Sequence, residues 1–331
     1  MCRHLAYVGD PLPLGHLLSD PAHSLVHQSW HPLHQRSGTV NADGFGVGWY
    51  ADTDPVPARY RRTGPIWADL TFTDLARVIR TRALLAAVRD ATLPGADGEA
   101  AAAPFASGRW LFSHNGAVKN WPTSMTPLAA TLPTTDLLSL EARTDSAFVW
   151  ALVLARLTKT ASAQPGGGAG AGSPDATGAP NTTPPGAGAA GPWGDTAAAG
   201  SPSDTPPAAA VWALGDASAG AVVADPPSDT VSAGPLGDAL AGALAEVVEA
   251  APGSRLNLLV TDGTSIAATA WGDSLWYLLD PGRGVVVASE PYDGDSAWRE
   301  VPDATLLTAT RTEVLLTPLK DLAAPPKEPR P

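Results

Sequence analysis

Residues 1–10 read MCRHLAYVGD, and Cys2 is the single cysteine in a chain of 331 residues. Methionine is usually removed when a small residue follows it, so we expect the mature chain to begin at Cys2. A free α-amino group has a pKa of roughly 7.7–8.0 and can accept the thiol proton near neutral pH. A nucleophile and its base would then lie on one residue. The opening stretch therefore predicts an enzyme that attacks its substrate with Cys2.

A second interpretation of Cys2 involves no chemistry. Free cysteines are often small buried residues of the core. Position alone does not separate such a residue from a nucleophile, so the rest of the sequence has to decide.

The composition limits the class of partner. With 44 % hydrophobic residues, the chain can bury the core of one large domain or of two ordinary ones. Its net charge of -12 argues against nucleic acid and anionic membranes, because both attract clustered Lys and Arg. We therefore expect a small-molecule substrate, and the sequence does not predict the oligomeric state.

Cysteine usage and hydropathy indicate a cellular compartment. One cysteine excludes an intramolecular disulfide, which fits a reducing environment. Pro11 and Pro13 interrupt the apolar run after the first residues, so a signal peptide is not expected. No apolar segment approaches the ~20 residues that span a bilayer. These features predict a cytoplasmic protein.

The first half of the chain alternates strand-like runs with helical ones. GFGVGWY at 44–50 and RWLFSHNG at 109–116 are short apolar runs bounded by turn signals, as in strands. Between them we expect a helix that reaches about Thr81 and a strand over 83–89. The clearest helix covers 145–159, with Thr144 or Asp145 as its N-cap.

Residues 161–210 consist almost wholly of Ala, Gly, Pro, Ser and Thr. Such a segment cannot bury enough apolar surface to offset the entropy of ordering it, so we expect disorder there. We interpret 160–235 as a low-complexity insertion in a single domain that covers 2–331.

Regular patterns resume after the insertion. A helix is expected over 238–253, followed by the strand-like runs RLNLLVTDG, SIAATAWGD, SLWYLLD and GVVVASEP. We expect antiparallel hairpins between strands this close in the chain, and a terminal hairpin over 305–319. Helices grouped between two sets of antiparallel strands indicate an α+β fold with helices covering stacked sheets.

An attack on a carbonyl needs hydrogen-bond donors aimed at the developing oxyanion. The run FSHNG at 112–116 can supply the Asn115 side-chain amide and the Gly116 backbone N–H. Asn-Gly is also the commonest signal of a two-residue hairpin turn. The motif alone therefore has two interpretations.

A substrate with an amino-acid end needs a guanidinium for its carboxylate and a carboxylate for its ammonium group. Arg89 can bind the carboxylate, Thr92 can donate a hydroxyl hydrogen bond, and Asp145 can pair with the ammonium group. Each also has a structural interpretation, as a surface arginine, a strand-end threonine and a helix cap.

Several stretches occur together in a recognisable order. MCRHLAYVG, NADGFGVGWY, AAVRDAT, PFASGRWLFSHNG and RTDSAF follow one another as in the class II glutamine amidotransferases, which are N-terminal nucleophile (Ntn) hydrolases. PIWADLTF, SRLNLLVTDG, ATAWGDSLWYL and VVVASEPYDGDSAWREVP resemble the branch of that family in ergothioneine biosynthesis, which hydrolyses a γ-glutamyl amide. The resemblance covers the chain except for about 160–235.

This resemblance implies a four-layer αββα sandwich of antiparallel sheets and a thioester mechanism. Cys2, after removal of Met1, would attack the γ-glutamyl carbonyl with its own α-amino group as general base. Asn115 and Gly116 match the oxyanion hole of the family. No cofactor is implied.

The resemblance also assigns the groups that bind the glutamyl part of the substrate. Arg89 with Thr92 matches the segment that holds the α-carboxylate, and Asp145 matches the aspartate that pairs with the ammonium group. The chain departs from the HTRWATHG form of the arginine motif, because Leu93 follows Thr92 where that form has a histidine. A backbone contact would survive this change, whereas a side-chain contact would not.

The histidines offer an alternative, because six of the seven fall within the first 34 residues. His27 and His31 have the i, i+4 spacing of helical metal ligands. Pro32 disfavours a helix at His31, and no third ligand follows from the spacing. We therefore expect no metal site.

Three functions remain open from the sequence. The first is a γ-glutamyl amidohydrolase, which the resemblance of the C-terminal strands favours. The second is a glutaminase subunit that supplies ammonia to a separate synthase and shares the same nucleophile and glutamyl site. The third is a non-catalytic scaffold with a vestigial hydrolase domain, which leaves the matched catalytic stretches unexplained.

Deletion of 161–210 tests the interpretation of the insertion. We expect the deletion variant to retain nearly all hydrolytic activity, because a disordered surface loop contributes little to a core. Activity and thermal unfolding of the variant, compared with the full chain, measure this. Loss of both folding and activity would contradict the expectation.

Overall fold

The computed structural model describes residues 2–35, 38, 40–91, 98–163 and 234–319. All of these residues belong to one compact unit. Most of the segment expected to be disordered, from residue 164 to 210, lies outside the described residues. Residues 161–163 were wrongly included in it, because they form the last turn of a long helix.

The first sheet has seven strands in the order β11-β9-β10-β1-β4-β2-β3, and all of its neighbours are antiparallel. Strand β1 therefore lies in the middle of the sheet, hydrogen-bonded on both sides. The strands are β1 (Arg3–Pro13), β2 (Phe45–Ala51), β3 (Asp54–Arg62), β4 (Arg80–Val88), β9 (Trp276–Asp280), β10 (Gly284–Ala288) and β11 (Arg299–Glu300).

The second sheet has six antiparallel strands in the order β13-β12-β8-β7-β6-β5. They are β5 (Phe105–Ser107), β6 (Trp110–Ala117), β7 (Arg255–Thr261), β8 (Ser265–Ala270), β12 (Thr305–Thr310) and β13 (Val314–Pro318). The expected hairpins β7–β8, β9–β10 and β12–β13 are present. A hairpin between β8 and β9 was wrongly expected, because the chain crosses there from the second sheet to the first.

Seven α-helices and three short 3₁₀ turns complete the described part of the chain. They are α1 (Gly15–Leu18), α2 (Leu25–Gln28), η1 (Ile66–Ala68), α3 (Leu70–Val78), η2 (Gly98–Ala101), η3 (Thr123–Met125), α4 (Thr126–Ala129), α5 (Thr134–Leu138), α6 (Asp145–Ala163) and α7 (Gly234–Ala250). Helix α3 ends three residues before the expected Thr81, because Ile79 is already extended and begins the approach to β4.

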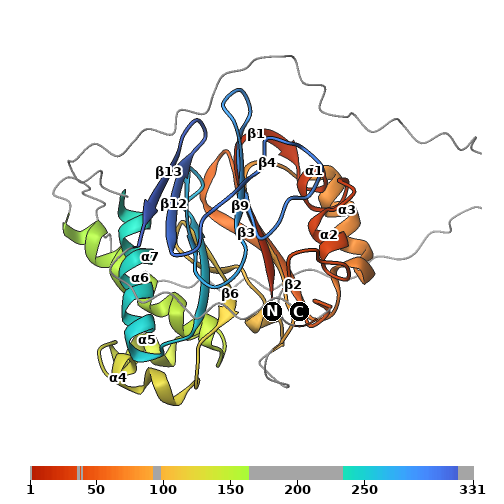
Figure 1. The fold of residues 1–331 in the computed structure, drawn as a ribbon. Helices are drawn as coiled ribbons and strands as arrows, with labels where there is room; N and C mark the ends of the chain where they lie inside the picture. Colours follow the sequence, from red (N-terminus) through yellow and green to blue (C-terminus); the bar gives the residue numbers. More distant parts are fainter. Residues whose placement is uncertain (1, 36–37, 39, 92–97, 164–233, 320–331) are drawn as a thin grey trace, which may run out of the picture. The chain divides into compact units, whose positions relative to one another are not determined.

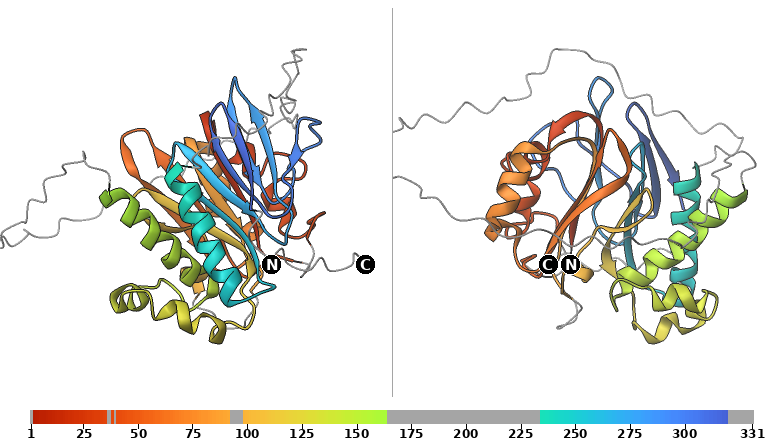
Figure 2. Two further views of the ribbon diagram at one scale, coloured as in Figure 1. Left: turned by 60° about the vertical axis from the view of Figure 1, so that its left-hand side comes forward. Right: turned by 180° about the vertical axis from the view of Figure 1, so that it is seen from behind.

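The two sheets stack face to face, and helices cover their outer faces. Figures 1 and 2 show α6 and α7 on one flank and α1, α2 and α3 on the opposite flank, with both sheets between them. One apolar cluster lies between the sheets and includes Ala6, Leu85, Leu259 and Val287. Each flank has one further apolar cluster, which lies between its helices and the sheet that they cover. This arrangement confirms the αββα sandwich.

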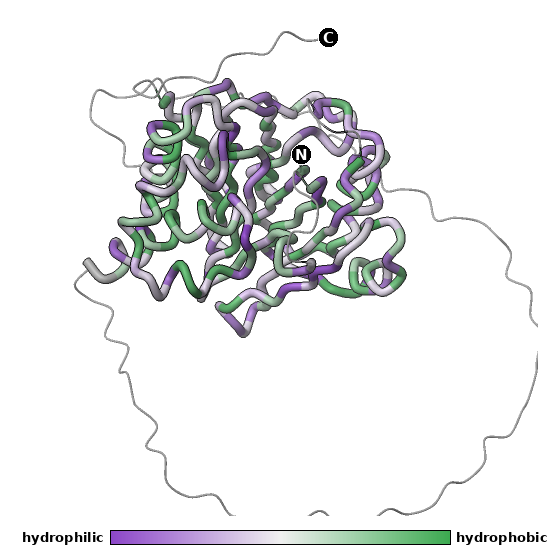
Figure 3. Tube along the Cα trace, turned by 90° about the horizontal axis from the view of Figure 1, so that it is seen from below, coloured by the Kyte–Doolittle hydropathy of each residue, from purple (hydrophilic) through white to green (hydrophobic). Residues whose placement is uncertain are grey.

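Strand β1 contributes to two of these layers because its side chains alternate in direction. Leu5 and Tyr7 belong to the cluster beneath α1–α3, whereas Ala6 and Val8 belong to the cluster between the sheets. In Figure 3 the tube changes repeatedly between hydrophobic and hydrophilic colouring along its course. Among the described helices, none has the length and apolar character needed to cross a membrane.

Candidate active site

The pairing of β1 with β4 fixes the position of Cys2. Arg3 is the cross-strand partner of Val88, and extending this register by one residue places Cys2 beside Arg89. The backbone N–H of Asp90 donates a hydrogen bond to the Cys2 sulfur. The end of β4 therefore holds the thiol at one end of the central strands of the first sheet.

A cavity of about 250 Å³ lies beside the thiol. Cys2, Arg89, Gly116 and Asp145, which the sequence analysis singled out, all line it. They come from the start of β1, the end of β4, the end of β6 and the start of α6. Residues far apart in the chain thus meet at one site, which includes a thiol, a guanidinium and a carboxylate.

The Arg89 backbone is anchored by the turn that precedes β2. Its N–H donates to the Gly44 carbonyl oxygen at 2.8 Å, and its Nη1 donates to the Asp43 carbonyl oxygen at 3.4 Å. The Asp43 carboxylate in turn accepts the Ala91 N–H at 2.7 Å. The turn therefore restrains the segment on both sides of Arg89.

Asp145 is oriented by backbone donors. Its Oδ2 accepts the Val118 N–H at 2.9 Å, and its Oδ1 accepts the Ser146 N–H at 2.8 Å. Thr144 caps α6 through the Ala147 N–H at 3.2 Å. Because Thr144 takes the capping role, the Asp145 carboxylate is directed to the end of β6 and can also accept bonds from a cationic ligand.

Asn115 and Gly116 lie within β6, so the hairpin-turn interpretation of this dipeptide is wrong. Asn115 pairs with Asn257 of β7 in the interior of the sheet. Its side chain is fully buried, and neither its Nδ2 nor its Oδ1 has a hydrogen-bond partner. A buried amide without a partner is costly, and such groups in native structures call for a functional explanation.

The Asn115 side chain is not among the groups that line the cavity. Because side chains alternate along a strand, it shares the face of β6 that carries Ser113. Ser113 Oγ lies 3.2 Å from His4 Nδ1 of β1, so this face looks toward the strand that carries Cys2. The amide therefore lies on the nucleophile side of the second sheet.

Gly116 is required by the close approach of β7. A Cβ atom at this position would collide with the Arg255 carbonyl oxygen and lie 2.8 Å from His114 Nε2. Its φ of 153° is positive as well. Only glycine therefore leaves its backbone N–H at the cavity wall without displacing β7.

The surroundings of the thiol favour its protonated form. Burial raises the pKa of Cys2, and the negative charge of Asp145 adds to this effect. The positive chain terminus, the Asp90 N–H and the Arg89 charge lower the pKa but do not outweigh burial. An attack by this thiol therefore needs a base close to it.

His4 is the histidine closest to Cys2 in the sequence, but it is a poor base for the thiol. Burial and the charge of Arg3 lower its pKa to about 3. Its imidazole is therefore neutral across the physiological range, and its Nδ1 contacts Ser113 rather than the cavity. An amino group on Cys2 itself would be a stronger base than this imidazole.

His114 is a cavity residue to which the sequence analysis gave no role. Its Nε2 lies 3.0 Å from the Arg255 carbonyl oxygen, and its Nδ1 lies 3.1 Å from Ser146 Oγ. The carbonyl oxygen can only accept, so Nε2 carries a proton. The FSHNG motif contained His114, but its alignment depends on Arg255 and Ser146, which are distant in sequence.

Thr92 lies outside the described residues, so its proposed contact with the substrate stays a prediction. The alternative metal site receives no support from the histidine geometry. Helix α2 ends at Gln28, and the His27 and His31 rings pack edge to face with centroids 5.5 Å apart. No group of three or more His, Cys, Asp or Glu among the described residues is arranged to hold a metal ion.

Comparison with known proteins extends the likeness over the whole chain. A profile of class-II glutamine amidotransferases matches residues 17–169. The chain is 32 % identical to the γ-glutamyl-hercynylcysteine sulfoxide hydrolase of Mycolicibacterium smegmatis, over 96 % of this chain and 100 % of that protein. The chain belongs to the class-II glutamine amidotransferase family.

Other comparisons agree with this assignment to the class-II amidotransferases. The protein of the same name from Mycobacterium tuberculosis is also 32 % identical, over 98 % of this chain and all of that protein. A class-II glutamine aminotransferase domain protein from Silicibacter pomeroyi has the same fold, with a TM-score of 0.53 at 19 % identity. That match covers 96 % of this chain and 99 % of the solved one.

Substitution of Gly116 tests the close approach of β6 and β7. We expect Gly116→Ala to lower the free energy of unfolding by about 3 kcal/mol, because the new Cβ overpacks the Arg255 carbonyl. Gly108→Ala is the control, since Gly108 also has a positive φ but has open space around it. The control should cost only ~1 kcal/mol from backbone strain. Equal denaturant midpoints for the two variants would contradict the packing argument.

Proposed function

We propose that this class-II amidotransferase is a γ-glutamyl amidohydrolase that converts γ-glutamyl-hercynylcysteine sulfoxide to hercynylcysteine sulfoxide and glutamate in ergothioneine biosynthesis. The observation that carries the proposal is the meeting of Cys2, Arg89 and Asp145 at one cavity. These three groups match a thioester nucleophile and the two ends of an α-amino acid. The full-length relatives bearing this hydrolase name support the choice of substrate.

Binding of the glutamyl part uses opposite charges on two sides of the cavity. The Arg89 guanidinium pairs with the substrate α-carboxylate, and a guanidinium suits this planar group because it can donate two parallel hydrogen bonds. Asp145 accepts a hydrogen bond from the substrate α-ammonium group. Thr92 donates a hydroxyl hydrogen bond to the same carboxylate. The γ-carbonyl of the substrate then extends toward Cys2.

The α-amino group of Cys2, exposed by removal of Met1, takes the thiol proton. The sulfur attacks the γ-carbonyl carbon, and the negative charge that develops on the carbonyl oxygen is stabilised by the Asn115 amide and the Gly116 N–H. The partnerless Nδ2 of Asn115 fits this role, because an oxyanion would satisfy a donor that is otherwise buried without a bond.

Collapse of the tetrahedral intermediate breaks the C–N bond. The Cys2 ammonium group gives its proton to the leaving amine, and a γ-glutamyl thioester remains on the sulfur. Water then attacks the thioester, with the α-amino group again acting as base. Glutamate leaves, and the thiol is restored without a cofactor.

The catalytic domain is proposed to be continuous across the insertion at 160–235. Helix α6 ends at Ala163 and helix α7 begins at Gly234, inside the expected bounds of the insertion, and both pack against the same sheet. Arg156 of α6 and Glu246 of α7 form an ion pair at 2.6 Å. Such packing supports one domain over 2–331 in which the insertion joins two adjacent helices.

The substrate assignment is tested with the purified chain alone. We expect glutamate release from γ-glutamyl-hercynylcysteine sulfoxide, with kcat/KM at least ~100-fold above that for free glutamine, because leaving-group contacts add to a shared glutamyl site. Chromatographic measurement of glutamate gives both values. Cys2→Ala is the control and should release none.

Other outcomes of this assay identify other functions. Comparable hydrolysis of glutamine, without a preference for the sulfoxide, would favour a glutaminase subunit that supplies ammonia to a synthase. No turnover of either compound by a chain that begins at Cys2 would contradict the hydrolase and favour a scaffold.

A further inference from the structure

Arg3 follows the nucleophile directly and is completely buried. It points to the face of β1 opposite to Cys2, because neighbouring residues of a strand face opposite sides. On that face its neighbours along the strand are Leu5 and Tyr7, which are apolar core residues. A fully buried guanidinium therefore occupies the position after Cys2, on a face of β1 where the next side chains, Leu5 and Tyr7, belong to the apolar core.

Glu290 lies beside Arg3 on the neighbouring strand segment. Leu5 pairs with Ala288, and the Ser289 N–H donates to the His4 carbonyl at 2.9 Å. The His4 N–H donates to Ser289 Oγ at 3.0 Å. One further step along both segments places Glu290 next to Arg3, and its carboxylate is also completely buried.

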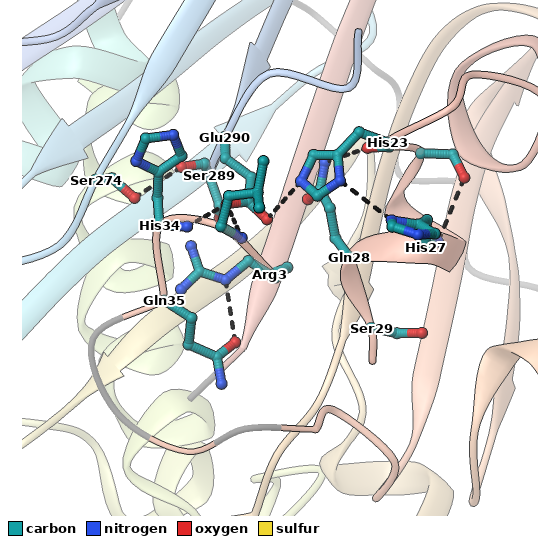
Figure 4. A network of polar contacts seen from close by, with 12 residues as sticks. Arg3, His23, His27, Gln28, Ser29, His34, Gln35, Ser274, Ser289 and Glu290 are labelled. Atoms are coloured by element: carbon teal, nitrogen blue, oxygen red, sulfur yellow. Dashed lines mark hydrogen bonds and ion pairs between the residues drawn. The ribbon is translucent and has the colours of Figure 1, made fainter. Parts of the chain in front are cut away.

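The Glu290 carboxylate attracts the Arg3 guanidinium electrostatically and also binds the segments on both sides of α2. Figure 4 shows the residues of this network, with Arg3, Glu290 and His23 labelled. Glu290 Oε2 accepts the backbone N–H groups of Leu33 and His34 at 3.0 and 2.6 Å. Its Oε1 lies 3.3 Å from His23 Nε2. One carboxylate thus bonds to three groups of the 23–34 segment.

Gln35 forms the second connection of Arg3. The Arg3 Nε donates to Gln35 Oε1 at 3.3 Å, and the same oxygen accepts from Asn41 Nδ2 at 3.0 Å. Asn41 is itself buried and donates its backbone N–H to the Ser29 carbonyl at 2.6 Å. Arg3 therefore bonds to Gln35 in the loop between α2 and β2, and Gln35 in turn bonds to Asn41 of the same loop.

The charges of this network stabilise one another. Burial alone would raise the pKa of the Glu290 carboxyl, but the His23 hydrogen bond, the Arg3 charge and the His34 N–H hold it below its ordinary value. Glu290 also provides the largest electrostatic attraction on the Arg3 guanidinium. Burial lowers the pKa of Arg3, and the Glu290 charge is the strongest of the attractions that oppose this effect. Removing either group would therefore take the largest opposing charge from the other's buried surroundings.

A buried polar network of this kind contributes little net stability, because an apolar pair of the same volume is often as stable. Its distinctive effect is to fix the relative positions of the segments that it joins. Two strand segments and one loop have to meet at fixed points for all of its bonds to form. Those points surround the residue from which Cys2 emerges.

We propose that Arg3 is a positioning residue. Together with Glu290 and Gln35 it fixes the backbone at the start of β1, so that the Cys2 thiol faces the cavity. Arg3 touches neither the substrate nor the reacting atoms. The proposal deepens the proposed function and rests on it for its kinetic part.

The kinetic test uses Arg3→Gln, Arg3→Lys and Leu5→Ala in the full chain. We expect Arg3→Gln to lower kcat for glutamate release about 10- to 100-fold, because a small displacement of a nucleophile is enough for such a loss. KM should change less than ~3-fold, since Arg89 and Asp145 are untouched. Arg3→Lys keeps the charge and should recover part of kcat.

Leu5→Ala is the matched control for stability. Leu5 is as deeply buried, lies on the same face of β1 and takes no part in the polar network. It should lower the melting temperature while leaving kcat within ~3-fold of the parent, measured below the unfolding transition. If kcat falls equally in Leu5→Ala and Arg3→Gln at matched melting temperatures, Arg3 is merely structural and the proposal is wrong.

The double variant Arg3→Gln/Glu290→Gln protects the test against a failure to fold. It leaves no uncompensated buried charge, so we expect it to fold when Arg3→Gln does not. Because the two residues act as a unit, its kcat should be no lower than that of either single variant. The proposal would be overturned if the kcat losses of the two single variants multiplied in the double variant, or if the double variant had the kcat of the parent.

A substrate-independent measurement separates this inference from the proposed function. Cys2 is the only thiol, so its rate of alkylation by iodoacetamide reports on this site alone. At pH 7.5 we expect Arg3→Gln to react at least ~3-fold more slowly, because a displaced thiol loses the Asp90 N–H and the Arg89 charge that favour its thiolate. Leu5→Ala should react as the parent does.

If the parent hydrolyses no γ-glutamyl compound, the proposed function fails while the alkylation rates still decide the role of Arg3. Unchanged alkylation in Arg3→Gln would overturn the positioning role whatever the substrate is.

Discussion

The backbone pairing of β1 with β4 and β10 is the constraint on which the rest of the site depends. It holds the first residues of the chain in the middle of a seven-stranded sheet rather than at a free end. Chain termini are poorly ordered unless they are tied down in this way. Here hydrogen bonds on both sides of β1 fix the direction in which Cys2 leaves the sheet. A terminal residue thereby gains the precision of a core strand.

The two faces of β1 serve different needs. Toward the second sheet, Cys2 lines the cavity, His4 contacts Ser113, and apolar residues of the inner core follow. On the opposite face Arg3 meets a buried carboxylate and an amide from the loop after α2. The chemistry is thus placed on one face and the polar contacts that orient the strand on the other. The αββα layering makes this division possible, because each sheet has one face against the other sheet and one against helices.

Much of this arrangement could be predicted from short-range pattern. The strands around 44–50 and 109–116, the long helix at Asp145 and the αββα layering follow from hydrophobic periodicity and from the family resemblance. The position of Asn115 within a strand was not decidable locally, because Asn-Gly is a turn signal unless neighbouring strands pair on both sides. The partners of His114 and Arg3 lie at least 32 residues away, and Arg255 and Glu290 lie more than a hundred residues away, so no local pattern identifies them. The crossing between β8 and β9 depends likewise on a later segment, because β8 pairs with β12 instead of β9.

The most direct test of this account is intact-protein mass spectrometry of the full chain during turnover of γ-glutamyl-hercynylcysteine sulfoxide with rapid acid quenching. We predict a chain that begins at Cys2 and a transient species heavier by one glutamyl group, located on Cys2 by peptide mapping and removed by hydroxylamine, as expected for a thioester. A chain that retains Met1 yet turns over the substrate, or turnover without an adduct on Cys2 under conditions where deacylation is slowed, would contradict the account.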